Sequence, residues 1–417
     1  MHMWPLTSVA ARGAGQSDLS RYSHISILKI LPSIFCMDSP VTLRKSCLIC
    51  QSNELTQILP TDTSLPLGCF PVKDLTFPCH IVPYNAVHCS ACGVVQTKYV
   101  GNLDLVYGHN FAGICGTTRG NMNTLFSEFI LETPHLSSIV EIGAGNGEVS
   151  DIVLEKNSSL KYSIVDPAYW GNESNRTVLK YFFEDITEDI IHTPDTVIMS
   201  HVFEHFYSPF NILKKIASLK SVSNILLNWP NLEEFVKDRT YHVLNMEHIF
   251  YAENKYIEQL FEMVGFKLSR IYSYNKFAIF YHFEREVDSI SVSKIFPTNQ
   301  TSFADVNSYF DYLFQKVKVF NTILDSNPDL PAYIWPCSVH TSFCFMAGLQ
   351  KDKIKNILDN SPAKIGNFLY GFSIPCISFR QTIESSEKKI VFLVGGQYTK
   401  EIYDKCIENP ENQVFIL

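Results

Sequence analysis

A glycine-rich turn in the middle of the chain, at residues 143–147, constrains the fold more than any other feature. The apolar segment 138–142 is predicted to be a buried strand, and a helical pattern runs from the turn through Lys156. Gly143 and Gly145 let the backbone turn tightly and approach a ligand without a side-chain clash. A strand, a glycine turn and a helix in this order are typical of nucleotide-binding α/β domains.

Strand-like and helix-like segments alternate on both sides of the turn, from about residue 107 to about residue 284. Further strands are predicted at 161–166, 196–201 and 224–228, and helices at 124–132 and 209–219. This alternation predicts a parallel sheet with helices on both faces. Ligands of such sheets bind beyond the carboxyl ends of the strands.

A second alternating region follows the first. Apolar residues recur every three or four positions over 303–324, which predicts a long amphipathic helix. After Pro331, strands are predicted at 333–335, 354–358 and 390–394, and helices at 342–349 and 399–408. We expect this region to form another nucleotide-fold-like unit.

Two Cys-x-x-Cys pairs precede the glycine turn, with 38 residues between them. Cys47, Cys50, Cys89 and Cys92 are therefore predicted to form a structural zinc site, because four thiolates make a closed tetrahedral shell. Other residues within the gap could replace one ligand, namely Cys69, Cys79, His80 and His88. The alternatives are two pairs that arise by chance and a redox dithiol, but a redox pair usually begins a helix, and neither pair does. The remaining cysteines are scattered, which is typical of a reducing compartment such as the cytoplasm.

The composition excludes several classes of function. Lys and Arg number 34 against 42 Asp and Glu, a formal net charge of −8, whereas nucleic-acid binding needs a basic surface. No segment approaches the roughly 20 apolar residues of a membrane helix. We expect no nucleic-acid or membrane partner. Residues 1–36 fit a signal peptide poorly, and we expect a disordered extension or an upstream start before Met37.

Three acidic residues around the turn indicate its ligand. Glu141 precedes the first glycine by two positions, where it would repel a pyrophosphate but suits a cationic amino-acid group. Asp166 follows Gly147 by 19 residues and can accept hydrogen bonds from two ribose hydroxyls. Asp185 follows the next apolar run and can meet an adenine amino group. With Gly143, Gly145 and Gly147, this set resembles the S-adenosylmethionine site of class I methyltransferases more than a dinucleotide site.

Two polar clusters are predicted to lie over the same crevice. The strand at 196–201 runs into Ser-His-Val-Phe-Glu-His, so that His201 is expected beside the cofactor and His205 beyond it. Glu247 and His248 form a second pair, in which the carboxylate can orient the imidazole and raise its basicity. The alternatives are a satisfied core histidine in the first cluster, and a helix-start carboxylate with an exposed histidine in the second.

Taken together, these motifs resemble those of sugar C-methyltransferases that act on nucleotide-linked deoxysugars. The resemblance covers the cysteine pairs running into 93–96, the segment 141–147, and 357–366, which is similar to the family's Asp-x-Ser/Asn-Pro-x-Lys-x-Gly segment. It implies an α/β chain with three domains: a zinc-binding domain, a class I methyltransferase domain with a Rossmann-like sheet, and a C-terminal Rossmann-like domain. Their expected bounds are 37–105, 106–290 and 300–417, with a linking helix at 303–326.

The resemblance also implies roles for single residues. His205 lies near the sugar, Glu247 and His248 form the general-base region, and Tyr107 lines the substrate pocket. Arg119 and Lys364 are candidates for the positive charge that a sugar diphosphate requires. At 245–246 the chain has Asn-Met where the family often has Tyr-His, which leaves the sugar open.

The expected function is methyl transfer from S-adenosylmethionine to a carbon of a nucleotide-linked keto-deoxysugar, through an enolate that a base generates. The alternatives are O-methylation of a sugar hydroxyl, a non-sugar small molecule or protein as acceptor, and a non-catalytic protein of the same fold. The expected cofactors are S-adenosylmethionine and structural Zn²⁺. We expect a nucleotide-sugar substrate and a monomer or weak homodimer.

Overall fold

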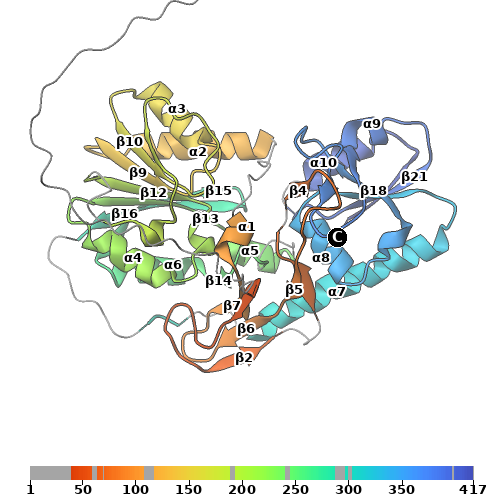
Figure 1. The fold of residues 1–417 in the computed structure, drawn as a ribbon, viewed down its shortest axis with the longest axis horizontal. Coiled ribbons are helices and arrows are strands. Elements are labelled where there is room, and N and C mark those ends of the chain that lie inside the picture. Colours follow the sequence, from red (N-terminus) through yellow and green to blue (C-terminus); the bar gives the residue numbers. More distant parts are fainter. Residues whose placement is uncertain are drawn as a thin grey trace, which may run out of the picture. The chain divides into compact units, whose positions relative to one another are not determined.

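The segments around the glycine turn form a seven-stranded sheet in this computed structural model (Figure 1). The strand order is β11-β10-β9-β12-β13-β16-β15. The bounds are β9 (Ser138–Ile142), β10 (Lys161–Val165), β11 (Thr177–Leu179), β12 (Thr196–Ser200), β13 (Asn224–Pro230), β15 (Phe266–Tyr274) and β16 (Ala278–Arg285). Within this sheet β16 runs antiparallel to both of its neighbours, and the other pairings are parallel.

The structure describes residues 39–58, 63–68, 70–107, 117–187, 193–239, 245–286, 296–298, 303–396 and 399–416. The extension predicted at 1–36 lies outside them. Among the described helices, none combines the length and the apolar character that crossing a membrane requires.

The two faces of the large sheet bury alternate residues of the same strand. Ile139 shares an apolar cluster with Phe126 of one helix layer, whereas its neighbour Val140 shares another with Leu213 of the opposite layer. The helices are α2 (Thr117–Leu131), α3 (Glu148–Lys156), α4 (Pro209–Ser218), α5 (Leu232–Lys237) and α6 (Asn254–Glu262). Strands buried on both faces require helices on both sides, so the prediction of helices on both faces is confirmed. The prediction of a parallel sheet holds for five of the strands, whereas β16 runs antiparallel to β13 and β15.

The cysteine-rich region contributes short antiparallel sheets. The largest has the order β14-β7-β6-β2, with β2 (Leu55–Gln57), β6 (Ala86–Cys89), β7 (Val95–Thr97) and β14 (Phe250–Tyr251). Two further pairs join β1 (Val41–Leu43) to β8 (Tyr99–Gly101) and β3 (Ser64–Pro66) to β5 (Ile81–Pro83), and α1 (Leu103–Tyr107) follows. Because β14 lies far along the sequence, its pairing with β7 ties the cysteine region to the large α/β unit.

The C-terminal region forms a five-stranded parallel sheet of order β20-β18-β17-β21-β22. Its elements are α7 (Phe303–Ser326), β17 (Ala332–Trp335), α8 (Val339–Met346), β18 (Ile354–Asp359), β20 (Cys376–Ser378), α9 (Phe379–Ile383), β21 (Lys389–Leu393), α10 (Thr399–Cys406) and β22 (Asn412–Ile416). Counted along the chain, this is the doubly wound order 3-2-1-4-5. A small pair, β19 (Phe368–Leu369) with β4 (Pro71–Val72), joins it to the cysteine region.

Two predicted helix starts are wrong. Helix α2 begins at Thr117 rather than at residue 124, because the segment between them contains Gly120 and two asparagines, whose low helix propensity hides the pattern. Helix α8 begins at Val339 rather than at residue 342, because the Ser338 side chain accepts a hydrogen bond from the His340 N–H and caps the helix there.

Candidate active site

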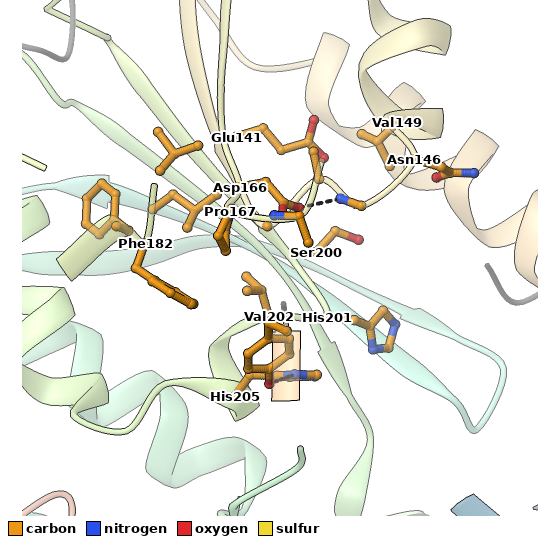
Figure 2. Close-up of a pocket in the computed structure, with 18 of the residues that line it drawn as sticks. Glu141, Asn146, Val149, Asp166, Pro167, Phe182, Ser200, His201, Val202 and His205 are labelled. Carbon is orange, nitrogen blue, oxygen red and sulfur yellow. Dashed lines mark hydrogen bonds between the residues drawn. The ribbon is translucent and has the colours of Figure 1, made fainter. Parts of the chain in front are cut away.

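A cavity of about 320 Å³ opens at the carboxyl ends of β9, β10 and β12 (Figure 2). Strand β9 has β10 on one side and β12 on the other, so the cavity lies where the strand order reverses. Its lining includes Tyr107, Arg119, Asn123, Glu141, residues 142–146, Glu148, residues 165–168, Phe182, Phe183, Glu184, residues 200–202, His205 and Glu247. Residues predicted for the cofactor and for the acceptor therefore share one cavity.

The glycine turn has the backbone that its residue types predict. Gly143, Gly145 and Gly147 have φ angles of 71°, 59° and 77°, in the left-handed region that favours glycine. A Cβ on Gly143 would lie 2.4 Å from a methyl carbon of Val202, so a larger residue cannot fit. Gly147 does not line the cavity. A Cβ at that position would lie 2.5 Å from the Tyr169 hydroxyl oxygen.

The Asp166 carboxylate holds the turn in place. One oxygen accepts a hydrogen bond from the Gly145 N–H at 2.7 Å, and the other accepts one from the Ala168 N–H at 2.8 Å. Burial raises the pKa of Asp166, and the two N–H groups oppose that shift. Each oxygen retains a lone pair, so the same carboxylate can also accept from ribose hydroxyls.

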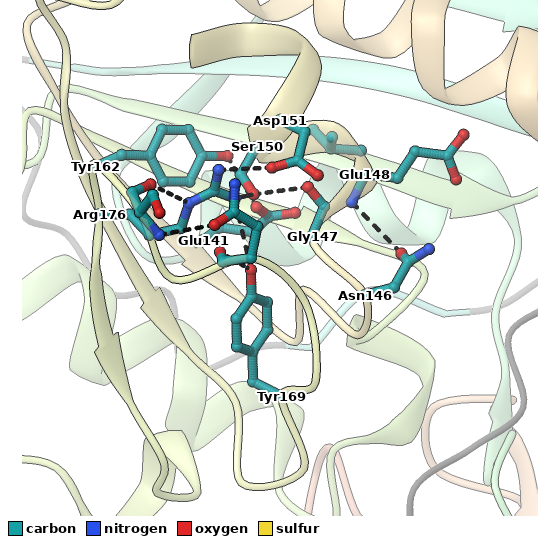
Figure 3. A network of polar contacts seen from close by, with 12 residues as sticks. Glu141, Asn146, Gly147, Glu148, Ser150, Asp151, Tyr162, Tyr169 and Arg176 are labelled. Atoms are coloured by element: carbon teal, nitrogen blue, oxygen red, sulfur yellow. Dashed lines mark hydrogen bonds and ion pairs between the residues drawn. The ribbon is translucent and has the colours of Figure 1, made fainter. Parts of the chain in front are cut away.

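Glu141 is a buried member of a polar network beside the glycine turn (Figure 3). Its side chain is 1 % exposed and accepts a hydrogen bond from the Tyr162 hydroxyl at 2.8 Å. Nearby, the Arg176 guanidinium pairs with Asp151 at 2.5 Å. Burial raises the pKa of Glu141 to about 7, despite the Tyr162 hydrogen bond. An ammonium group in the cavity would therefore stabilise the ionised form of Glu141.

Of the two remaining residues predicted to bind the cofactor, His201 lines the cavity and Asp185 does not. His201 lines the cavity with a φ of 52°, and burial, reinforced by Arg119, lowers its pKa. Asp185 does not line the cavity, whereas its neighbour Glu184 does. Residues 183–185 form a short 3-10 turn, in which the adjacent side chains of Glu184 and Asp185 point in different directions.

At the opposite end, side chains from three parts of the chain meet. The Tyr107 hydroxyl and the His205 Nδ1 are 2.8 Å apart, and the ring centres of His205 and His248 are 4.9 Å apart. Asn245 accepts hydrogen bonds from the N–H groups of Glu247 and His248, at 2.7 and 2.9 Å, which fixes that loop. Burial, with a contribution from His248, lowers the pKa of His205 to about 3, so that its imidazole is neutral.

Comparison with known proteins assigns the domain that carries this cavity. Residues 118–270 match the family model described as "Methyltransferase domain". The chain carries a class I methyltransferase domain. The predicted fold and the predicted S-adenosylmethionine-dependent methyltransferase are thus confirmed at the level of this domain, and the match includes neither the cysteine pairs nor the C-terminal region.

Solved structures with similarity to this chain include an O-methyltransferase family protein from Burkholderia thailandensis and human N-acetylserotonin methyltransferase in complex with S-adenosylmethionine. Their identities are both 12%, and their TM-scores are 0.33 and 0.34. The matches cover 41% and 40% of this chain and 58% and 52% of the other chains, so each neighbour is spanned only in part. The search of curated proteins found no match.

Outside the methyltransferase domain, the two cysteine pairs converge. The four sulfur atoms lie within 4.8 Å of one another, and Cys47–Cys92 and Cys50–Cys89 are each 3.6 Å apart. Contact with Cys92 and backbone N–H groups lower the pKa of Cys47 to about 5. Zinc–thiolate bonds of about 2.3 Å in a tetrahedron place sulfurs roughly 3.8 Å apart, so these residues fit a structural zinc ion.

Lys364 is not part of the methyltransferase cavity. Its ammonium pairs with Asp359 at 3.0 Å inside the C-terminal sheet domain, where the lysine side chain is 12% exposed. The Asp359 carboxylate also accepts from the Cys337 N–H, so the ion pair joins two loops of that domain. The positively charged side chain that does line the cavity is Arg119.

One residue that the sequence pattern left without a role is Glu204. It lies between the two histidines of the Ser-His-Val-Phe-Glu-His segment, and its side chain is 0% exposed. Its Oε1 is 3.5 Å from the Nδ1 of His201 and 4.0 Å from the Nε2 of His205. An acid flanked by two histidines at a strand end was the sequence signal that pointed to it.

Proposed function

We propose that this methyltransferase transfers a methyl group to a carbon of a nucleotide-linked keto-deoxysugar. The observation that carries the proposal is the single cavity, which has Glu141 and Asp166 at one end and a cluster of imidazole and carboxylate groups at the other. A cofactor and an acceptor bound at these two ends would be neighbours. The resemblance of segment 357–366 to sugar C-methyltransferases supports the choice of acceptor.

At the cofactor end, each residue has a physical task. The glycine turn admits the cofactor close to the backbone, Asp166 accepts from the ribose hydroxyls, and Glu141 balances the amino-acid ammonium group. His201 lies beside the same wall of the cavity. When bound there, S-adenosylmethionine supplies an electrophilic methyl group.

At the acceptor end, the chain supplies a base. A carbon next to a ketone is acidic enough to lose a proton to a positioned side chain, and the resulting enolate carbon is the nucleophile for the methyl group. Glu247 and His205 line the cavity, and His248 contacts His205, so the base belongs to this group of three. Tyr107 orients His205 through their hydrogen bond.

Among the charges that line the cavity, Arg119 offers the place where a compact anionic group of the acceptor can bind. The described lining contains five carboxylates, those of Glu141, Glu148, Asp166, Glu184 and Glu247. The described lining contains one Lys or Arg residue, Arg119. We propose that its guanidinium forms charge-assisted hydrogen bonds to the sugar diphosphate.

The cysteine cluster is proposed to bind a structural zinc ion. Its sheet reaches the acceptor end directly, because β7 pairs with β14, and the Thr97 N–H donates to the Ile249 carbonyl at 2.8 Å. Ile249 follows the Glu247–His248 pair, so the zinc sheet would position the base region.

The test is a methyl-transfer assay with ¹³C-methyl S-adenosylmethionine and a panel of keto and hydroxy nucleotide sugars, followed by NMR of the products. The proposal predicts a new carbon–methyl signal on the carbon next to the ketone, which the enolate regenerates when its carbon takes the methyl group. A methyl on oxygen would instead establish O-methylation. Transfer to none of the sugars, with transfer to a peptide or a non-sugar metabolite, would contradict the sugar assignment.

A further inference from the structure

The buried carboxylate of Glu204 lacks the partners that such a group normally requires. Its side chain is 0% exposed, and neither oxygen makes a hydrogen bond within the described residues. A buried ionised carboxylate without hydrogen bonds costs several kcal/mol, so native interiors supply a cation or a proton donor. The neighbouring groups show which of these the site is built to supply.

Imidazoles surround this carboxylate at distances too long for hydrogen bonds. The contacts of Oε1 with His201 Nδ1 and His205 Nε2 are 3.5 and 4.0 Å, beyond the usual 3.2 Å limit for such a bond. The Nδ1 of His205 is engaged by the Tyr107 hydroxyl, so Nε2 is the ring nitrogen on the side of Glu204. A carboxylate oxygen and a ring nitrogen thus face each other across a gap.

The segments that carry these groups are fixed to each other. The Ile249 N–H donates to the Glu204 carbonyl at 3.1 Å, which places His248 beside the turn at residues 203–205. One ligand atom each from Glu204, His205 and His248 lie within 4.8 Å of one another. Metal–ligand bonds of about 2.0–2.2 Å would draw these atoms together by roughly an ångström, which rotations of the side chains can supply.

We propose that Glu204, His205 and His248 bind a divalent transition-metal ion at the acceptor end of the cavity. Two imidazoles and a carboxylate suit Zn²⁺, Mn²⁺, Fe²⁺ or Co²⁺ rather than the hard ions Mg²⁺ and Ca²⁺. The Tyr107 hydroxyl acts as the outer partner that fixes the ring of a ligating histidine. Three protein ligands leave a coordination position open, and His205 borders the cavity.

The ion gives the acceptor end a second function beyond the proposed base. A divalent cation at the open position polarises a carbonyl or hydroxyl oxygen of the acceptor and makes the neighbouring proton more acidic. With His205 and His248 as ligands, Glu247 remains as the cavity carboxylate that takes that proton. This site differs from the cysteine cluster in ligand chemistry, because thiolates select Zn²⁺ whereas imidazole and carboxylate also accept Mn²⁺.

Direct metal binding tests the proposal without relying on activity. One sample of the full-length protein is loaded with zinc, and bound zinc is counted by elemental analysis. A second sample, which carries zinc at the cysteine cluster alone, is titrated with Mn²⁺, and free Mn²⁺ is followed by electron paramagnetic resonance. We expect two zinc ions per chain in the wild type, one in Glu204→Gln and one in Cys92→Ser. Mn²⁺ binding should weaken at least 100-fold in Glu204→Gln and His248→Gln, and about 10-fold in Tyr107→Phe.

The matched control is Glu148→Gln, which changes a carboxylate at the cofactor end of the same cavity and should leave Mn²⁺ binding unchanged. Thermal unfolding without added metal checks folding, and Glu204→Gln should be at least as stable as the wild type, because it removes a buried unpaired charge. One zinc ion in the wild type with no Mn²⁺ binding, or equal Mn²⁺ binding in Glu204→Gln, would overturn the site. Neither result decides the proposed function, because the methyl-transfer assay measures a different property.

Discussion

At the scale of single residues, the cofactor end of the cavity contains two carboxylates that the protein itself buries. Glu141 and Asp166 are 1% and 7% exposed, and burial raises the pKa of both. Two backbone N–H donors offset the cost of burying the Asp166 carboxylate, whereas Glu141 accepts a hydrogen bond from the Tyr162 hydroxyl. Of these two carboxylates, Glu141 is therefore the one whose ionisation costs the folded protein more when the cofactor is absent.

The raised pKa of Glu141 predicts that the free energy of unfolding depends on pH, and that the substitution Glu141→Gln removes this dependence. The pKa of Glu141 rises from 4.5 to about 7 on folding, so the folded state binds the proton more tightly. Its contribution to the free energy of unfolding is fully present below pH 4.5 and is lost as the pH rises through 7, by about 3 kcal/mol in total. Urea unfolding of the cofactor-free wild type and Glu141→Gln between pH 5 and pH 8 measures the difference. A difference that is constant with pH would contradict this assignment.

Asp166→Ala tests the other carboxylate. The substitution removes the acceptor for two N–H groups and for the ribose, so we expect affinity for S-adenosylmethionine to fall by at least about 10-fold. Calorimetric titration measures it. Glu128→Ala, which changes an exposed carboxylate on α2, is the control and should bind like the wild type. Unchanged binding in Asp166→Ala would remove this residue from the cofactor site.

At the scale of elements, the short strand β14 connects two regions that are distant in sequence. Phe250 and Tyr251 pair with Gln96 and Val95 of β7, directly after the second cysteine pair. The glycine turn instead lies between β9 and α3, and β9 pairs with β10 and β12 of the large sheet. Disturbing the cysteine cluster should therefore affect the acceptor end more than the cofactor end.

Cys92→Ser separates the two ends experimentally. Loss of the proposed zinc ion should loosen β7 and displace Glu247 and His248, and a displacement of about 1 Å can lower turnover by roughly 100-fold. Affinity for S-adenosylmethionine should change much less. Single-turnover rates and calorimetry give the two values, with Cys79→Ser, an exposed cysteine outside the cluster, as control. An equal loss of both properties would argue against a specific role for β14.

At the scale of the whole molecule, the question is where a chain with a net charge of −8 recognises an anionic acceptor. The lysine predicted for this task is engaged with Asp359 in the C-terminal domain. Arg119 lines the cavity instead, at the start of α2. A single cation among carboxylates gives a local, directional attraction rather than a broad positive surface.

Arg119→Gln should therefore raise the KM for a nucleotide-sugar acceptor by about 10- to 100-fold, with a smaller change in kcat, because a charge-assisted hydrogen bond to a bound group is lost. Steady-state kinetics at two salt concentrations measure this, and the wild type should lose more affinity at high salt than the variant. Lys156→Gln, which removes an exposed lysine paired with Glu128, is the control. An unaltered KM would place the diphosphate elsewhere.

The sequence alone determined the features that depend on local spacing. Alternation of apolar segments predicted the sheet with helices on both faces, and the glycines at 143, 145 and 147 predicted the left-handed turn that β9 and α3 require. These follow because backbone conformation and face periodicity are decided within a few residues. The Cys-x-x-Cys spacing similarly predicted that the four sulfurs would meet.

The tertiary structure decided which side chains share a site. Tyr107 meets His205 across 98 residues of sequence, and the fully buried Glu204 is joined to the loop at 245–249 by the hydrogen bond from the Ile249 N–H to its carbonyl. The 3-10 turn at residues 183–185 places Glu184, rather than Asp185, at the cavity wall. Contacts of this kind depend on how loops from separate elements pack together, and no local periodicity in the sequence encodes that packing.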